Sequence, residues 1–170
     1  DIILAFPGLI LAMALVILFG PSVNSAITAL ILVGWPSYTR IVRAQFLAIK
    51  QNDYVEAALA VGCSHLRVIV KHILPNAIYP ILILASLDIG AIVLSIAALS
   101  FLGLGAPIGY ADWGQLISLS RNWIIGTPQN PFEYWYTYII PGVFIFTFVM
   151  GWNLLGDAFR DMLDPMIRRR

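Results

Sequence analysis

The chain has 170 residues, of which 60% are hydrophobic and only 11% are charged, and its mean hydropathy is +0.87. Soluble domains are nearer half apolar and a quarter charged, so this composition argues against a water-soluble globule and indicates a lipid bilayer as the solvent. The formal net charge of +1 points neither to nucleic acid nor to an acidic partner. Cys63 is the only cysteine, which excludes an intrachain disulfide, and a small buried hydrophobic residue explains it better than a nucleophile does.

The first apolar segment begins at the start of the chain. Asp1 is preceded by no basic leader and the run is followed by no small-residue cleavage site, so we expect a piece that begins partway through a longer membrane protein. Residues 2–19 carry no charge and as a helix would extend roughly 27 Å, about the thickness of bilayer hydrocarbon. The turn Gly20-Pro21-Ser22 should end this segment.

Three further apolar segments follow, at about 23–41, 77–104 and 138–155, and Asp88 is the only charge in the second of these three. One such segment could be the core helix of a soluble protein, but four in a short chain predict an all-α, polytopic transmembrane helix bundle. Glycine and proline recur inside the segments, which transmembrane helices tolerate better than soluble ones. These residues are Pro7, Pro36, Gly90, Pro141 and Gly151.

Lysine and arginine are distributed unevenly over the connections. Residues 38–76 contain five of them and the tail after Leu155 contains four, whereas residues 105–137 contain Arg121 alone. Basic loops stay in the cytosol, so we predict a multi-pass protein of the cell membrane with residues 38–76 and the C-terminus inside and residues 105–137 outside. The basic residues on the predicted inner side are Arg40, Arg43, Lys50, Arg67, Lys71, Arg160, Arg168, Arg169 and Arg170.

Aromatic residues gather in the predicted external loop. Tryptophan and tyrosine are typical of both membrane interfaces, so an interfacial belt is a better interpretation than an aromatic cage for a ligand. The residues are Trp113, Trp123, Tyr134, Trp135 and Tyr136.

The predicted inner connection contains the most informative stretch, residues 53–76. Asp53 followed three residues later by Glu56 resembles a capping box, and the alanine-rich residues 54–61 predict a helix. Gly62 stands where a left-handed C-cap is required.

A second short helix is predicted directly after this glycine. Ser64 can cap it, it should run over residues 65–74, and Pro75 should end it because the residue before a proline avoids the α region. A DNA-binding helix-turn-helix shares this pattern, but apolar segments enter and leave within a few residues and the basic residues are too few to neutralise phosphates. A plain polar loop would not need these caps, so a protein-docking element is the best interpretation.

The stretch resembles a motif of a known family. Glu56-Ala57-Ala58, then Gly62 after three residues and His72-Ile73-Leu74-Pro75 after nine more, looks like the EAA loop of ABC importer permeases. The form with His72, read as HILPN, is similar to the branch that imports dipeptides, oligopeptides and nickel. Further stretches resemble the second permease subunit of that branch over nearly the whole chain: DIILAFPGLILA, GWPSYTRIVRAQ, LSFLGLG, the pair Trp113-Gly114, and NLLGDAFRDMLDP.

This resemblance implies a fold, partners and site residues. The fold would be that of a type I ABC importer permease, and the loop would be the coupling element that docks into a groove of a cytosolic ATPase. The partners would be a second permease subunit, ABC ATPase subunits and an extracytoplasmic substrate-binding protein, with ATP and Mg²⁺ held by the ATPase and no cofactor on this chain. The implied coupling residues are Glu56, Ala57, Ala58, Gly62, His72, Leu74 and Pro75.

Motifs for catalysis and for metal binding are missing from the sequence. No phosphate-binding G-x-x-x-x-G-K-[ST], H-E-x-x-H, G-x-S-x-G or C-x-x-C occurs. His65 and His72 lie seven residues apart without a third ligand nearby, so a zinc site is a poorer explanation than structural histidines. We therefore expect a transport subunit rather than an enzyme, and no nucleic-acid partner.

Asp88 is the one ionisable residue predicted at depth in the membrane. It could line a path for cationic peptide termini or make a structural hydrogen bond to a neighbouring helix, and the sequence favours neither interpretation over the other. Many members of the family have a glutamate just before the LSFLG segment, where this chain has Ile96. A secondary transporter would need several such residues, and a membrane-tethered adaptor would need the docking loop but no pathway.

Overall fold

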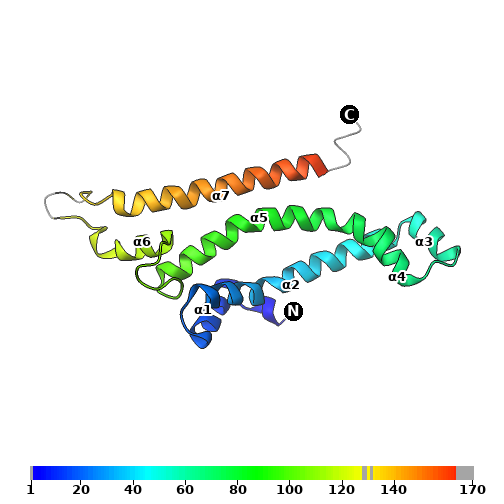
Figure 1. Ribbon diagram of the computed structural model, residues 1–170, viewed down its shortest axis with the longest axis horizontal. Coiled ribbons are helices and arrows are strands. Elements are labelled where there is room, and N and C mark those ends of the chain that lie inside the picture. The colour runs from blue at the N-terminus through cyan, green and yellow to red at the C-terminus, as the bar shows by residue number, and fades with distance from the viewer. Residues whose placement is uncertain (1, 128–129, 131, 164–170) are drawn as a thin grey trace.

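The structure is a computed structural model that describes residues 2–127, 130 and 132–163. Asp1, Pro165 and the three terminal arginines, which the sequence analysis uses, lie outside these residues. The described chain consists of helices and turns without a strand, which confirms the all-α prediction. Three long helices, α2, α5 and α7, run side by side and give the molecule an elongated shape (Figure 1).

The first apolar segment forms a shorter helix than predicted. A 3₁₀ turn at Ile3–Ala5 is followed by α1, Gly8–Phe19, of 12 residues. Phe6 is extended, with φ −95° and ψ 143°, because a residue that precedes a proline disfavours the helical region, and here that proline is Pro7. The helical part is therefore roughly 18 Å long, shorter than bilayer hydrocarbon.

Helix α2, Val23–Lys50, turns back on α1 and then leads away from it to the other end of the molecule (Figure 1). The Ser22 hydroxyl accepts a hydrogen bond from the Ser25 N–H at 3.1 Å and so caps the helix. A first apolar cluster joins the α1–α2 hairpin to the far end of α5, and its fully buried members are Ala12, Val16, Ala26, Ala29 and Leu99.

Helix α5, Leu74–Phe101, packs against α7, Tyr136–Leu163. Small residues let the two backbones approach, as is usual between membrane helices. A Cβ at Gly90 would lie 3.3 Å from a methyl of Val149, and a Cβ at Gly156 would lie 2.6 Å from a methyl of Leu87. The face of α5 that contacts α7 is thus specified by small side chains on both helices.

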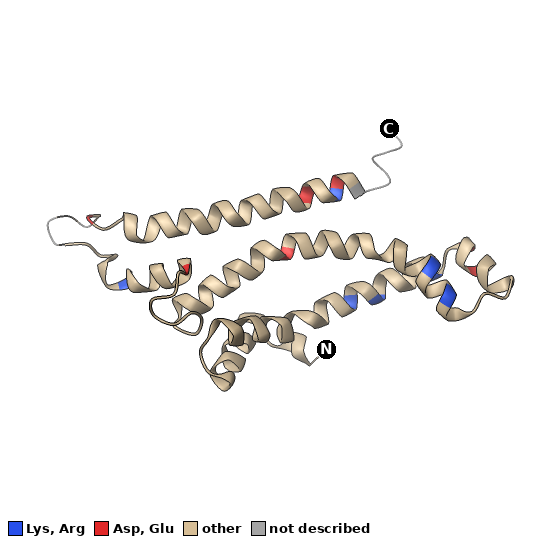
Figure 2. Ribbon diagram, viewed as in Figure 1, with Lys and Arg blue, Asp and Glu red and all other residues tan. Residues whose placement is uncertain are grey.

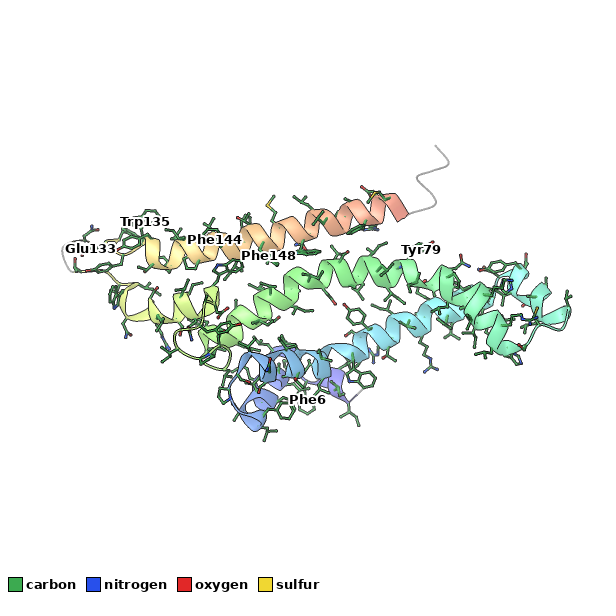
Figure 3. All side chains as sticks on the ribbon, in the orientation of Figure 1. Phe6, Tyr79, Glu133, Trp135, Phe144 and Phe148 are labelled. Carbon is green, nitrogen blue, oxygen red and sulfur yellow. The ribbon has the colours of Figure 1, made fainter. Side chains whose placement is uncertain are left out.

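The predicted external loop contains a helix that the sequence analysis missed, α6, Trp113–Leu119, followed by a 3₁₀ turn at Arg121–Trp123. Asp112 caps α6 by accepting a hydrogen bond from the Gln115 N–H at 3.0 Å, and an aspartate before an apolar run could have indicated this start. The Trp113 ring stacks on Phe144 of α7, with centroids 6.0 Å apart, so this tryptophan also packs between helices. Figure 3 shows the position of Phe144 on α7.

The opposite end of the molecule holds α3, Asp53–Ala60, and α4, His65–Val68 (Figure 1). A second apolar cluster fixes them to the last turns of α2 and the first turns of α5. Its buried members are Ile49, Val55, Val68, Ile73 and Ala77. Basic side chains occur in the second half of α2, in α4 and in the turn that follows α4, whereas α6 contains none and only Arg121 follows it (Figure 2). The predicted inner and outer connections therefore lie at opposite ends of the molecule.

Two helices of the described chain are long and apolar enough to cross a membrane, His65–Phe101 and Tyr136–Met162, and Gly8–Phe19 is apolar but shorter. The predicted number of four spans therefore remains a prediction.

Candidate functional site

The start of α3 differs by one residue from the predicted capping box. Asn52 has the extended backbone of an N-cap, with φ −77° and ψ 140°, and its side chain makes no capping hydrogen bond. Asp53 is already helical, so the prediction that it caps the helix is wrong. Asp53 and Glu56 both lie in the first turn, where a negative charge is favoured by the helix dipole. Glu56 is exposed and available to a partner.

The glycine turn after α3 is confirmed. Gly62 has φ +89°, its N–H donates to the Leu59 carbonyl at 2.9 Å, and the Cys63 N–H donates to the Ala58 carbonyl at 3.1 Å. These two bonds are those of a Schellman motif, in which only glycine adopts the required backbone without strain. A Cβ on Gly62 would meet no atom within 4 Å, so the requirement for glycine in this chain is conformational rather than steric.

Val55 anchors α3, a role that the sequence analysis missed. Its side chain is 0% exposed within the second apolar cluster, and Ala58 and Leu59 pack against the same cluster. The spacing of these three residues is the i, i+3, i+4 pattern of a helix face turned toward a core. Ala57, one residue away from this face, is exposed.

The second short helix does not end at Pro75, as predicted, but continues into α5. His65–Phe101 is one helical stretch of 37 residues that contains a π-helical turn at Ile69–Ile73. The Leu74 N–H donates to the Ile69 carbonyl, five residues earlier. Local widening of this kind accommodates a proline, which lacks an N–H and crowds the preceding turn, so the helix can pass through Pro75.

The residues around this turn connect α3 to α5. The Asn76 side chain donates to the His72 carbonyl at 2.7 Å and lies 3.4 Å from the Tyr54 hydroxyl. The rings of Tyr54 and His72 are in contact, with centroids 6.5 Å apart. The implied coupling residue His72 thus packs on α3, and Asn76, which sequence reasoning did not select, reinforces that contact.

Apolar side chains around the glycine turn are left in the open. Val61 is 86% exposed and Leu66 is 72% exposed, and Leu74 and Pro75 are also exposed. Arg67 and Lys71, which lie between Leu66 and Leu74 in the chain, are exposed too. Exposed apolar groups accompanied by charged residues are typical of a protein contact surface.

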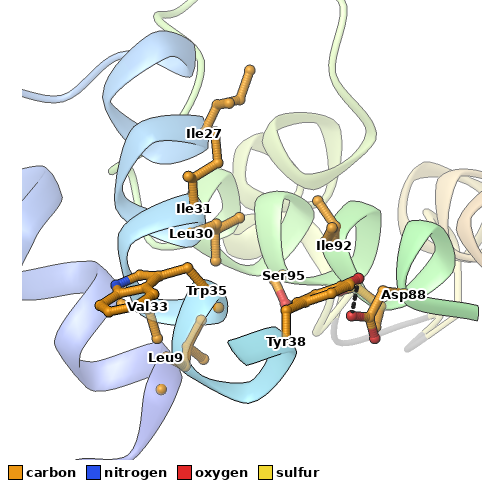
Figure 4. A pocket seen from close by; sticks show the side chains of 13 residues that line it. Leu9, Ile27, Leu30, Ile31, Val33, Trp35, Tyr38, Asp88, Ile92 and Ser95 are labelled. Carbon is orange, nitrogen blue, oxygen red and sulfur yellow. Dashed lines mark hydrogen bonds between the residues drawn. The ribbon is translucent and has the colours of Figure 1, made fainter. Parts of the chain in front are cut away.

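Asp88 lies elsewhere, in a cavity between α1, α2 and α5. The cavity has a volume of about 620 Å³ (Figure 4). The Tyr38 hydroxyl of α2 donates a hydrogen bond of 2.6 Å to Oδ2 of Asp88, and Asp88 is only partly buried. The structural hydrogen bond and the position beside an open space, which the sequence analysis treated as alternatives, therefore occur together.

The remaining wall of this cavity is almost entirely apolar. The Ser95 hydroxyl also lines it but donates to the Ala91 carbonyl at 2.8 Å, so its proton is already used. The apolar side chains come mainly from α2 and include Ile27, Leu30, Ile31, Val33 and Trp35. Within the ranges that the structure describes, no group of three histidine, cysteine, aspartate or glutamate side chains is placed to hold a metal ion.

Comparison with known proteins gives one family over nearly the whole chain. Residues 1–169 match the sequence model of the binding-protein-dependent transport system inner membrane component. The chain is 40% identical over 168 residues to the dipeptide transport system permease protein DppC of Alkalihalophilus pseudofirmus, covering 99% of this chain and 53% of that protein.

Two Escherichia coli proteins are also similar. The chain is 41% identical over 165 residues to the "Probable D,D-dipeptide transport system permease protein DdpC" of strain K12, covering 97% of this chain and 53% of that one. It is 35% identical over 168 residues to the glutathione transport system permease protein GsiD of strain O1:K1 / APEC, covering 99% and 53%. The chain thus spans about half the length of the curated relatives it matches.

Proposed function

The chain belongs to the family of binding-protein-dependent transport system inner membrane components, and from this membership we propose that it is a permease subunit of an ATP-driven importer of peptides or related small solutes. It would form half of the pathway together with a second permease subunit. ABC ATPase subunits would bind ATP and Mg²⁺ on the inner side, and an external binding protein would deliver the solute.

The observation that carries the proposal is the continuity of α4 with α5. A segment that docks on an ATPase transmits motion only if it is rigidly joined to the helices that line the pathway. Val55 and the contact of Tyr54 with His72 fix α3 to this long helix, and the same helix carries Asp88 into the cavity. Displacement of α3 and α4 by the closing ATPase would therefore tilt α5.

The change of state would be discrete rather than gradual. Packed helices move between alternative arrangements because close-packed contacts do not deform continuously. Each nucleotide state of the ATPase would favour one arrangement by its differential contacts with residues 53–76, and the pathway would switch between inward-open and outward-open. Exposed Val61, Leu66 and Glu56 would supply those contacts.

The test is reconstitution of the complete importer with Gly62→Val. We expect normal membrane insertion but a joint loss of ATPase association and of transport, because a β-branched residue at φ +89° distorts the turn that holds α3 against α4. Ala60→Ser, at an exposed position in the last turn of α3, is the matched control and should change little. Normal ATPase association and normal stimulated hydrolysis in Gly62→Val would contradict the assignment of the coupling element.

A further inference from the structure

The cavity beside Asp88 lies between two packed regions. The first apolar cluster joins α1 and α2 to the end of α5 around Leu99, and the second joins α2 to the beginning of α5 around Ile73. Asp88 is close to the middle of α5, between these two clusters, and Tyr38 is at the corresponding level of α2. An ionisable side chain in the middle of a helix that is long and apolar enough to cross a membrane is a candidate for a functional group.

The two side chains retain unused capacity for hydrogen bonds. A hydrogen bond of 2.6 Å between a hydroxyl and a carboxylate is short and charge-assisted. Among the described residues it is the only interaction of the Asp88 side chain, and no basic side chain forms an ion pair with it. An ionised carboxylate can accept further bonds at its second oxygen, and the Tyr38 oxygen retains acceptor capacity. Asp88 and Tyr38 therefore offer hydrogen-bond acceptors and a negative charge to the cavity.

These features favour a protonated amine over an inorganic cation. Ca²⁺ and Mg²⁺ need about six oxygen ligands, and one carboxylate with one hydroxyl falls well short of that number. An ammonium group has three N–H donors and needs only a few acceptors. The apolar wall from α1 and α2 suits a hydrocarbon group next to the amine, and a cavity of about 620 Å³ has the size of a small-molecule site.

We propose that Asp88 and Tyr38 form a subsite for the protonated amine of a transported solute, with an apolar group of that solute against Leu30, Ile31 and Trp35 (Figure 4). The inference rests on the proposed importer function and adds the chemistry that the pathway recognises. Tyr38 acts as a positioning residue because its hydroxyl fixes one carboxylate oxygen and leaves the other for the amine.

The first test uses Asp88→Asn in the complete importer, reconstituted in proteoliposomes with its partner subunits and binding protein. The probes are alanyl-phenylalanine and its N-acetyl derivative, which differ in the amine. Each variant rate is divided by the wild-type rate for the same peptide, which removes the selection made by the binding protein. We expect about a tenfold loss for the free amine, the loss of roughly one charge-assisted bond, and no change for the acetylated peptide.

Tyr38→Phe should also lower the transport rate of the free-amine peptide and leave that of the acetylated peptide unchanged. The loss should be smaller, about threefold, because Tyr38 acts on the amine through Asp88. Two substitutions outside the cavity are matched controls, Asp161→Asn on the exposed face of α7 and Tyr79→Phe at an exposed position of α5. For both controls, the transport rate relative to wild type should stay at one for each of the two peptides. Equal losses for the two peptides, or no loss for either, in Asp88→Asn would overturn the subsite.

A second measurement does not depend on transport. A hydrophobic carbodiimide should add to the Asp88 carboxyl of the wild-type complex, and mass spectrometry of the peptides would detect the adduct. We expect alanyl-phenylalanine to protect Asp88 from the carbodiimide. The acetylated peptide and K⁺ should give no protection. Equal protection by either of the latter would refute amine recognition. If the wild-type complex shows no ATP-driven uptake, the proposed importer function is disproved. The amine subsite would still be tested separately, by whether alanyl-phenylalanine protects Asp88 from the carbodiimide.

Discussion

The two ends of the molecule contain the same local structure, and the surroundings of that structure differ. At one end α3 closes in a Schellman turn at Gly62, and at the other α5 closes in one at Gly103, whose φ is +79°. The Gly103 N–H donates to the Ser100 carbonyl at 2.9 Å, and the Leu104 N–H donates to the Leu99 carbonyl at 2.9 Å. In both turns, a Cβ on the glycine would meet no atom within 4 Å.

The chain takes a different course after each of these turns. Beyond Gly103 it folds back on α5: Gly114 of α6 lies directly against Ala97, and the buried Gln115 amide donates to the Ala106 carbonyl at 2.8 Å. Around Gly62 it leaves Val61 and Leu66 in the open. The end of α5 is thus covered in part by α6 of the same chain, although Ile108 and Ile125 at that end are exposed as well. Val61 and Leu66 at the α3–α4 end form an exposed apolar surface that a partner can cover. We therefore expect substitutions at the α6 end to affect the stability of the protein, and substitutions at the α3–α4 end to affect its association with the ATPase.

The largest effect is expected for Gly114→Val. A Cβ at this position would overlap the main-chain carbonyl of Ala97, which is part of α5 and cannot turn away, so α6 must separate from α5. We expect a loss of about 3 kcal/mol in stability, at the upper end of the usual range for overpacking. Thermal unfolding of the purified complex would measure it. Gly151→Ala, in an exposed part of α7 with no atom within 4 Å, should be neutral or slightly stabilising.

Gly62→Ala and Gly103→Ala should have similar local costs and different consequences. Both place a side chain at positive φ in open space, at a cost of about 1 kcal/mol in local stability. We expect weaker ATPase association for Gly62→Ala only, and a lower unfolding temperature with normal association for Gly103→Ala. Pull-down of the ATPase and thermal unfolding, measured on both variants, would separate the two effects. An equal loss of ATPase association in both variants would contradict the proposal that only the α3–α4 end contacts the ATPase.

The smallest effects concern the helix caps. Asp112 accepts a hydrogen bond from the Gln115 N–H, whereas the Asn52 side chain makes no capping bond to α3. Asp112→Ala should therefore lower stability by roughly 0.5–1 kcal/mol, and Asn52→Ala by only a few tenths. Thermal unfolding of the two variants in parallel is the measurement. A larger loss for Asn52→Ala would show that α3 depends on a cap that the structure does not contain.

The sequence predicted the elements whose cause is local. Hydropathy over 77–104 and 138–155 indicated two long apolar helices, because a transmembrane helix needs little more than an unbroken apolar run. Gly62 was located correctly, since a left-handed turn between two helices requires a residue without a Cβ. The family could be identified for the same reason, because residues 56–75 are contiguous in the chain.

Only the tertiary structure decided which interruptions the helices tolerate and which side chains meet. Pro75 is passed by a π-helical turn, because the packing of Ile73 and Ala77 in the second cluster keeps the chain helical against the local preference of proline. Tyr38 and Asp88 are 50 residues apart, and nothing in either local sequence indicates their hydrogen bond. Such pairs depend on how α2 and α5 pack along their length, which is a property of the assembled helices and not of any one segment.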